Sequence, residues 1–281
     1  MPSLAAFVAD THLNSRVAMC PLSYRFRGNG EFRANKSQRA IHRRWKAAWD
    51  IVYETQKKLD AKLYVHVVGD AMDINAHDGI DPISRFEPDV IDLGEEVYGE
   101  IVERADYTFF YRGTEAHDKE HGKLTEQLAT RFVKQNGGSS VVPDEQAGYN
   151  SWGWFWGEID GVMFDVTHHP KTSTRIRANR GAAAARQQRR VRDGYLDRGD
   201  KPPDIGVYAH GHFWADSGTT VKPRVFLLPP WVLANSYGDR LGVGGEIEPV
   251  GLLLVICDNG KYEARDMRWQ FPRRRKPWKG E

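Results

Sequence analysis

Short apolar runs typical of β-strands alternate along this chain with longer amphipathic stretches typical of helices. We expect strands at seven segments: residues 4–9, 63–68, 107–111, 161–166, 205–208, 225–228 and 251–257. We expect the clearest helix from Lys36 to about Asp60, because apolar residues recur there near the 3.6-residue period. Such alternation favours an α/β architecture over separate helical and β domains.

Three more helices and two hairpins complete the predicted elements. The helices are expected at residues 93–105, 124–135 and 176–193. Asp160-Gly161 and Asp258-Asn259-Gly260 each stand between two strand-like runs, which is a strong signal for a hairpin turn.

The length and composition of the chain indicate its general class. Its 281 residues, of which 40% are hydrophobic, can bury one large core. We expect a single domain over residues 1–271 and a basic Pro/Arg tail at 272–281. No apolar run is long enough to span a bilayer, and the first residues lack the pattern of a signal peptide. Cys20 and Cys257 have no zinc-ligand spacing and are expected to be free thiols. The sequence therefore predicts a cytoplasmic protein with no membrane partner, and it indicates no oligomeric state.

Acidic residues and histidines follow five of the predicted strands, at the point where each strand ends. They are Asp10 and His12; Asp70 and Asp73; Glu115, His117 and Asp118; His168 and His169; and His210 and His212. In open α/β sheets, ligands bind beyond the carboxyl ends of the strands. We therefore expect these side chains to converge in space, although they are far apart in the sequence.

The chemistry of this set predicts a metal centre. Imidazole and carboxylate groups suit zinc, manganese or iron, whereas calcium prefers oxygen ligands and iron–sulfur clusters need cysteine. A structural zinc ion uses about four ligands, and this set offers more. The surplus indicates two ions that share a carboxylate.

The order of these residues resembles the motifs of the calcineurin-like metallophosphoesterases. That family has Asp-x-His, Gly-Asp-x-x-Asp, Gly-Asn-His, a lone His and Gly-His-x-His, and the match spans Asp10 to His212. The third motif is most similar to a branch found in phage and prophage genomes, which has Arg-Gly-Thr-x-x-His. The resemblance implies a four-layer α/β sandwich, in which helices flank two mixed β-sheets and the metal site lies at the carboxyl ends of the strands. For a phage-encoded protein, the location would be the host cytoplasm.

The resemblance also implies roles for individual residues. Asp10, His12 and His212 would hold a first metal ion, Asp70 would bridge, and His168 and His210 would hold a second. His168 is preferred over His169, and Asp73 would orient a ligand without touching the ions. The ions would be divalent, with Mn²⁺ expected first and Zn²⁺ or Fe²⁺ as alternatives. As the residue that bridges the two ions, Asp70 would also take part in catalysis.

The third motif departs from the family pattern. Where most relatives have Gly-Asn-His, this chain has Gly113-Thr114-Glu115-Ala116-His117, so the usual Asn ligand is missing. Glu115 is a good metal ligand and is the predicted replacement, with Thr114 as the alternative. His117 is the predicted catalytic acid, and the alternative is that it is a substitute ligand.

The distribution of charge and aromatic residues bears on the substrate. Residues 171–201 contain ten Lys or Arg and three Asp, and residues 25–46 contain a second group of basic side chains. These segments favour a nucleic-acid partner. Trp152, Trp154, Phe155 and Trp156 could stack on bases, but Trp at alternate positions of a hairpin is more often part of the core.

These observations together predict a phosphoesterase that uses two metal ions to activate hydroxide. We expect a phosphodiesterase or nuclease acting on a phosphoester substrate. One alternative is a phosphomonoesterase that acts on proteins or nucleotides. The other, from a different class, is a nucleic-acid-binding accessory protein whose altered third motif has removed catalysis.

Overall fold

The computed structural model describes residues 1–28, 30–74, 82–135, 140–170, 180–233 and 248–271. All seven predicted strands are present, and their ends agree with the prediction to within one residue. The predicted basic tail lies outside the described residues.

The first sheet has five strands in the order β12-β11-β1-β4-β5. These are β1 (Ser3–Val8), β4 (Lys62–Val68), β5 (Tyr107–Tyr111), β11 (Val250–Asp258) and β12 (Lys261–Trp269). The strands β1, β4 and β5 run parallel, whereas β11 and β12 pair antiparallel as the predicted hairpin. The carboxyl ends of β1, β4 and β5 therefore meet at one edge.

The second sheet also has five strands, in the order β6-β7-β8-β10-β9. These are β6 (Phe155–Ile159), β7 (Val162–Thr167), β8 (Ile205–Tyr208), β9 (Ala215–Asp216) and β10 (Arg224–Leu227). The strands β7, β8 and β10 are parallel, and β6 pairs antiparallel with β7 as predicted. A separate small hairpin consists of β2 (Ser23–Arg25) and β3 (Glu31–Arg33).

The helices agree with the prediction except at some of their ends. They are α1 (Lys36–Leu59), α2 (Glu87–Arg104), α3 (Glu115–Asp118), the 3₁₀ helix η1 (Glu120–Gly122), α4 (Lys123–Gln135) and α5 (Arg180–Leu196). The start of α2 was predicted too late, at Leu93. Pro88 and the acidic residues Glu87 and Asp89 in its first turn are typical of a helix start, and they extend it toward the N-terminus. Of the helices among the described residues, none is both long and apolar enough to cross a membrane.

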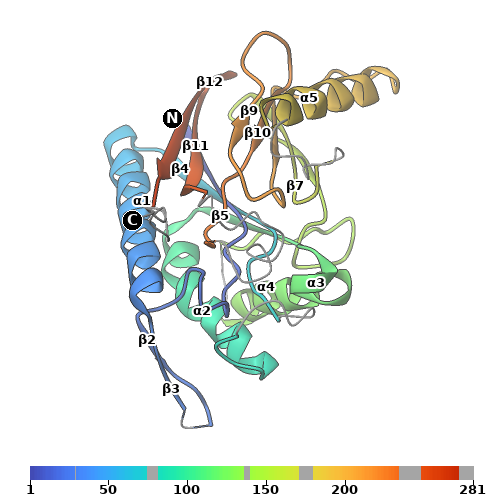
Figure 1. Ribbon diagram of the computed structural model, residues 1–281. Coiled ribbons are helices and arrows are strands. Elements are labelled where there is room, and N and C mark those ends of the chain that lie inside the picture. Colours follow the sequence, from blue (N-terminus) through green and yellow to red (C-terminus); the bar gives the residue numbers. More distant parts are fainter. Residues whose placement is uncertain (29, 75–81, 136–139, 171–179, 234–247, 272–281) are drawn as a thin grey trace, which may run out of the picture.

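Successive side chains along a strand point to opposite faces of the sheet, so both faces of each sheet are packed. The result is four layers, in which helices cover the outer faces of the two sheets. Leu4, Ala6 and Val8 of β1 pack against a core shared with α1, α2 and α4. Ala5 and Phe7 point the other way, into the core between the two sheets. The outer face of the second sheet packs against α5, which lies on the opposite side of the molecule from α1 (Figure 1). The predicted α/β sandwich of two mixed sheets between helices is confirmed.

A histidine lies in the core between the sheets. His66 on β4 is fully buried, and its ring stacks on Phe7 and Phe109 at centroid distances of 4.5 and 4.6 Å. Its Nδ1 atom is 2.8 Å from the hydroxyl oxygen of Tyr111. Burial lowers the pKa of His66 to about 3, so the ring is neutral in the folded protein.

We predict that His66 makes the protein sensitive to acid. An exposed histidine in the unfolded chain gains its proton near pH 6.5, whereas folded His66 stays neutral until about pH 3. Its contribution to stability is present above pH 6.5 and is lost as the pH falls, by about 1.4 kcal/mol per pH unit. Urea unfolding at pH values from 7 to 5 would measure this slope.

The matched comparison uses two variants. Tyr111→Phe keeps His66 and should keep the slope. His66→Phe combined with Tyr111→Phe removes the titrating ring without leaving a buried hydroxyl unpaired, and it should flatten the slope by the amount given above. Equal slopes in the two variants would contradict the prediction.

Candidate metal centre

The loops that follow the parallel strands are held together by backbone hydrogen bonds. Asp10 N donates to Gly69 O at 3.2 Å, and His12 N donates to Asp70 O at 3.0 Å. In the second sheet, Ala209 N donates to His168 O at 3.0 Å. The backbone thereby fixes the positions from which the acidic and histidine side chains project.

Five of the predicted metal ligands have backbone angles in the left-handed region. The φ values are 50° at Asp10, 43° at His12, 45° at Asp70, 63° at His210 and 54° at His212. Each such conformation in a residue other than glycine costs on the order of 1–3 kcal/mol and persists only where the surroundings impose it. Such strained residues cluster at functional sites, which marks these loops as a candidate site.

Side chains from both sheets converge at this edge. Four groups of three residues each place their ligand atoms within 4.8 Å of one another: Asp10, His12 and His212; Asp10, Asp70 and His168; His12, Asp70 and His117; and His168, His169 and His210. The structure therefore brings together six of the seven predicted metal ligands. The groups overlap, so the site is wider than a single ion requires.

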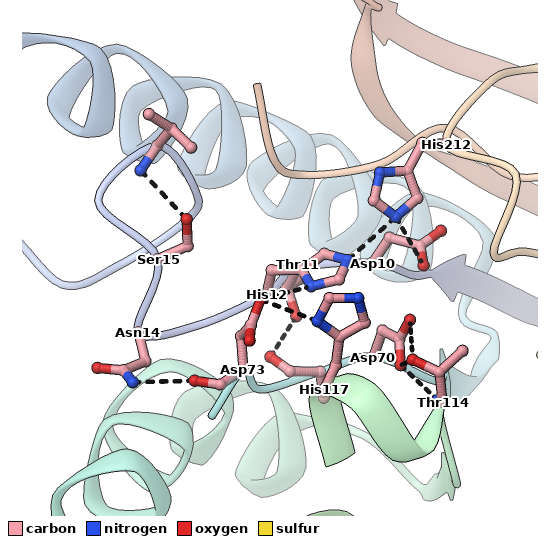
Figure 2. Close-up of polar contacts among 12 residues, drawn as sticks. Asp10, Thr11, His12, Asn14, Ser15, Asp70, Asp73, Thr114, His117 and His212 are labelled. Atoms are coloured by element: carbon pink, nitrogen blue, oxygen red, sulfur yellow. Dashed lines mark hydrogen bonds and ion pairs between the residues drawn. The ribbon is translucent and has the colours of Figure 1, made fainter. Parts of the chain in front are cut away.

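Individual contacts show how closely the side chains face one another. His12 Nε2 and His212 Nε2 are 3.0 Å apart, and His212 Nε2 is 3.5 Å from Asp10 Oδ1 (Figure 2). His168 Nε2 lies 3.1 Å from Asp70 Oδ2, while its Nδ1 is 2.9 Å from the carbonyl oxygen of Val68. The second bond orients the His168 ring so that Nε2 faces the carboxylates.

Buried atoms without hydrogen bonds show that the residues fit metal ions. Asp10 Oδ1 and His168 Nε2 are buried, and neither has an aligned hydrogen-bond partner among the described residues. Leaving such atoms unsatisfied costs about 1–3 kcal/mol each. Carboxylate oxygen and imidazole nitrogen both bind Mn²⁺, Zn²⁺ and Fe²⁺, and such an ion would satisfy both atoms.

The carboxylates of the site are held in the charged form. Burial raises the pKa of Asp70, but the neighbouring His168, His12 and His117 together outweigh burial and lower it well below the usual range. Conversely, burial disfavours the charged His168 ring, yet Asp70 raises its pKa to about 9. The interior thus contains concentrated negative charge that needs a positive partner, either a proton or a metal ion.

The third motif contacts Asp70 through Thr114 and not through Glu115. Thr114 N donates to Asp70 Oδ1 at 2.6 Å, and the Thr114 hydroxyl lies 3.0 and 3.1 Å from the two carboxylate oxygens. Glu115, the predicted replacement ligand, is exposed as the first residue of α3 and belongs to none of the four groups. The sequence pattern did not indicate that a helix starts at this residue.

Asp73 joins two histidines of the site. Its Oδ2 atom is 3.0 Å from His117 Nδ1 and 3.3 Å from His12 Nδ1. Burial raises the pKa of Asp73, but these two contacts lower it to about 2. Burial lowers the pKa of His117, and the contact with Asp73 more than offsets this and raises it. Asp73 therefore orients two imidazole rings, consistent with its expected indirect role.

Two residues that follow the predicted strands, but to which the sequence assigned no role, also lie at the site. His169 joins His168 and His210 in one group, although it is exposed, whereas His168 is fully buried. Asp118 is buried and accepts hydrogen bonds from Gly113 N and Thr125 N, at 2.9 and 2.8 Å. Burial raises the pKa of Asp118 to about 6. The sequence places Asp118 at a strand end, but its role as an anchor for the third-motif loop depends on the folded backbone.

Comparison with known proteins gives little beyond this geometry. No protein-family model matches the sequence, and no curated protein matches it. A solved structure of a Vps29 single mutant from Entamoeba histolytica is similar over 95% of this chain and 99% of that chain, with 12% sequence identity and a TM-score of 0.41. Similarity at this level supports no conclusion about activity.

We predict that a methyl group at Gly113 disrupts the site. A Cβ atom there would lie 2.1 Å from Asp70 Oδ1 and 2.4 Å from Asp70 N, so Asp70 must move. Gly113→Ala should weaken Mn²⁺ binding at least tenfold, as measured by equilibrium dialysis, while the circular dichroism spectrum stays that of the wild type.

Gly99 provides the matched control. It lies in α2, and a Cβ atom there would meet nothing within 4 Å. Gly99→Ala should bind Mn²⁺ as the wild type does. Unchanged Mn²⁺ affinity in Gly113→Ala would show that the position of Asp70 does not control metal binding.

Proposed function

We propose that this chain is a phosphoesterase dependent on two divalent metal ions, and that it hydrolyses phosphate diesters. Asp10, His12 and His212 would hold one ion, His168 and His210 the other, and Asp70 would be shared. The observation that carries the proposal is the overlap of buried carboxylate and histidine groups drawn from the strand ends of both sheets. The resemblance of the motifs to the calcineurin-like metallophosphoesterases supports the same class of reaction.

The chemistry follows from the residues of the site. Two divalent cations would neutralise the charge of the phosphoryl group and lower the pKa of a water molecule toward neutrality. Thr114 holds the Asp70 carboxylate in place through its amide and hydroxyl groups. His117 Nδ1 is engaged by Asp73, which leaves Nε2 to donate a proton to the departing oxygen. The raised pKa of His117 favours the charged ring that this role requires.

The basic segments contribute unequally to this proposal. Within residues 25–46, three of the eight Lys and Arg side chains form ion pairs with other described residues: Arg27 with Asp92, Arg33 with Glu31 and Lys46 with Glu100. Residues 171–179 of the second segment lie outside the described residues. The rest of that segment includes exposed arginines of α5, at positions 186, 189 and 192. We therefore retain both segments as proposed partner surfaces, with part of the charge of residues 25–46 already paired within the protein.

Hydrolysis of bis-p-nitrophenyl phosphate with added Mn²⁺ tests the proposed activity. Asp70→Asn removes the shared charge and should lower kcat/KM at least 100-fold. Glu115→Gln changes an exposed carboxylate and should stay within about threefold of the wild type. An equal loss of kcat/KM in the two variants would support Glu115 as a metal ligand. If the wild type hydrolyses no substrate with Mn²⁺, Zn²⁺ or Fe²⁺, the result would favour the alternative of a nucleic-acid-binding accessory protein without catalysis.

The role of His117 as an acid gives a separate prediction. p-Nitrophenolate leaves readily without a proton, whereas the alkoxide released from a dinucleotide such as thymidylyl-thymidine does not. His117→Gln should therefore lower dinucleotide hydrolysis by about 10²–10⁴-fold and affect bis-p-nitrophenyl phosphate much less. If His117 is instead a metal ligand, the hydrolysis rates of both substrates should fall by the same factor, and equilibrium dialysis should show weaker Mn²⁺ binding.

A further inference from the structure

Two tryptophans form an exposed aromatic pair, against the expectation that they belong to the core. Trp154 and Trp156 each expose 48% of their surface. Their rings are stacked, with centroids 6.3 Å apart and planes within 8° of parallel. Two large parallel rings in solvent are an unusual use of apolar surface and indicate a binding role. We call this pair the aromatic platform.

The aromatic platform lies on the outer face of the second sheet. Phe155, between the two tryptophans, packs into the core between the sheets. Since successive side chains of a strand point to opposite faces, Trp154 and Trp156 point outward. Trp156 lies beside Tyr195 of α5, with ring centroids 5.8 Å apart. Tyr195 is buried, so it supports the exposed Trp156 ring from the side of the helix.

The aromatic platform also lies next to the candidate metal centre. Phe155 pairs with Val166, and β6 runs antiparallel to β7, so β6 begins where β7 ends. The Thr167 hydroxyl donates to Gly153 O at 2.9 Å, and His168 is the next residue. Trp154 thus stands beside the strand end that delivers His168 to the site.

A basic side chain lies between the aromatic platform and the third motif. Arg112 N donates to Trp152 O at 2.9 Å, and its guanidinium lies against Gly153, where an added Cβ would be 2.7 Å from Nη2. The same guanidinium covers the ring of Tyr149, 4.6 Å from its centroid. Among the described residues, no carboxylate forms an ion pair with Arg112. Its neighbour Gly113 packs directly on Asp70.

Further positive charge flanks the other end of this surface. The Arg198 guanidinium lies 4.6 Å from the centroid of the Tyr195 ring, but its charge is already paired with Asp200 at 3.3 Å. Arg192 is exposed and precedes Tyr195 by three residues, which places it on the same side of α5. Stacking rings with cations at both ends match the alternation of bases and phosphates along a nucleic-acid strand.

We propose that the aromatic platform binds the bases of a single-stranded nucleic acid, and that Arg112 holds a backbone phosphate between these bases and the metal centre. The inference rests on the proposed phosphodiesterase function and names its substrate class. A single strand is required because the faces of paired bases are covered by their neighbours in a duplex. Stacking accepts any base, so the contact selects for single strands and not for sequence.

Fluorescence anisotropy of a labelled 12-residue oligothymidylate tests the aromatic platform directly. Binding would be measured with Mn²⁺ and, in parallel, with EDTA, so that the result does not depend on catalysis. Trp154→Ala combined with Trp156→Ala should weaken binding by about tenfold for each ring removed. Arg112→Gln should reduce the slope of the logarithm of the binding constant against the logarithm of salt concentration by about one, as expected for the loss of one phosphate contact. A duplex of the same length should bind more weakly than the single strand.

Tyr107→Ala is the matched control, because this exposed aromatic residue lies at the opposite end of β5 from Arg112. It should bind the oligonucleotide as the wild type does. Wild-type affinity in the double tryptophan variant would overturn the proposal. So would binding of an oligosaccharide in place of the oligonucleotide, or a change of oligomeric state in the double variant, since the rings would then serve sugars or a second copy of the chain.

The two proposals fail in different ways. Hydrolysis of bis-p-nitrophenyl phosphate by the wild-type protein reports the proposed reaction without using the aromatic platform as evidence. Oligonucleotide binding without any hydrolysis would overturn the reaction and leave the aromatic platform supported. Hydrolysis of the small diester without oligonucleotide binding would overturn the aromatic platform and leave the reaction supported.

Discussion

The buried contact between Asp70 and His168 joins the two sheets at the edge where the candidate metal centre lies. Asp70 follows β4 of the first sheet, His168 follows β7 of the second, and the ion pair spans 3.1 Å. Burial opposes the charge of both groups, so neither is tolerable there without the other or a metal ion. The third-motif loop is in turn fastened to Asp70 through Thr114.

The site is held by the scaffold at a cost in local stability. Left-handed backbone angles at five candidate ligands and unsatisfied buried atoms would each destabilise an ordinary loop. The apolar cores on both faces of the first sheet supply the opposing stability, because alternate residues of β1 pack against helices on one side and the second sheet on the other. Such strain persists only where the surrounding structure imposes the conformation.

The layers and most of the site could be predicted because they follow from local patterns. Periodicity located the strands, and six predicted ligands converge because parallel strands bring their carboxyl ends to one edge. The start of α2 was misplaced because apolar periodicity was given more weight than the proline and acidic residues that begin the helix. The prediction of Glu115 as a ligand used ligand chemistry alone, and the sequence pattern did not indicate that α3 begins at this exposed residue.

The sequence by itself determined the class of chemistry, since the kinds of side chain and their places at strand ends are properties of the chain. Only the tertiary structure decided which side chains face one another. Thr114 and not Glu115 contacts Asp70, and Asp118 anchors the third-motif loop. Likewise, alternation shows that Trp154 and Trp156 share a face, but whether that face is covered depends on the packing of α5 against the second sheet. The direction and burial of these side chains depend on contacts between segments that are distant in the sequence, and local periodicity does not encode such contacts.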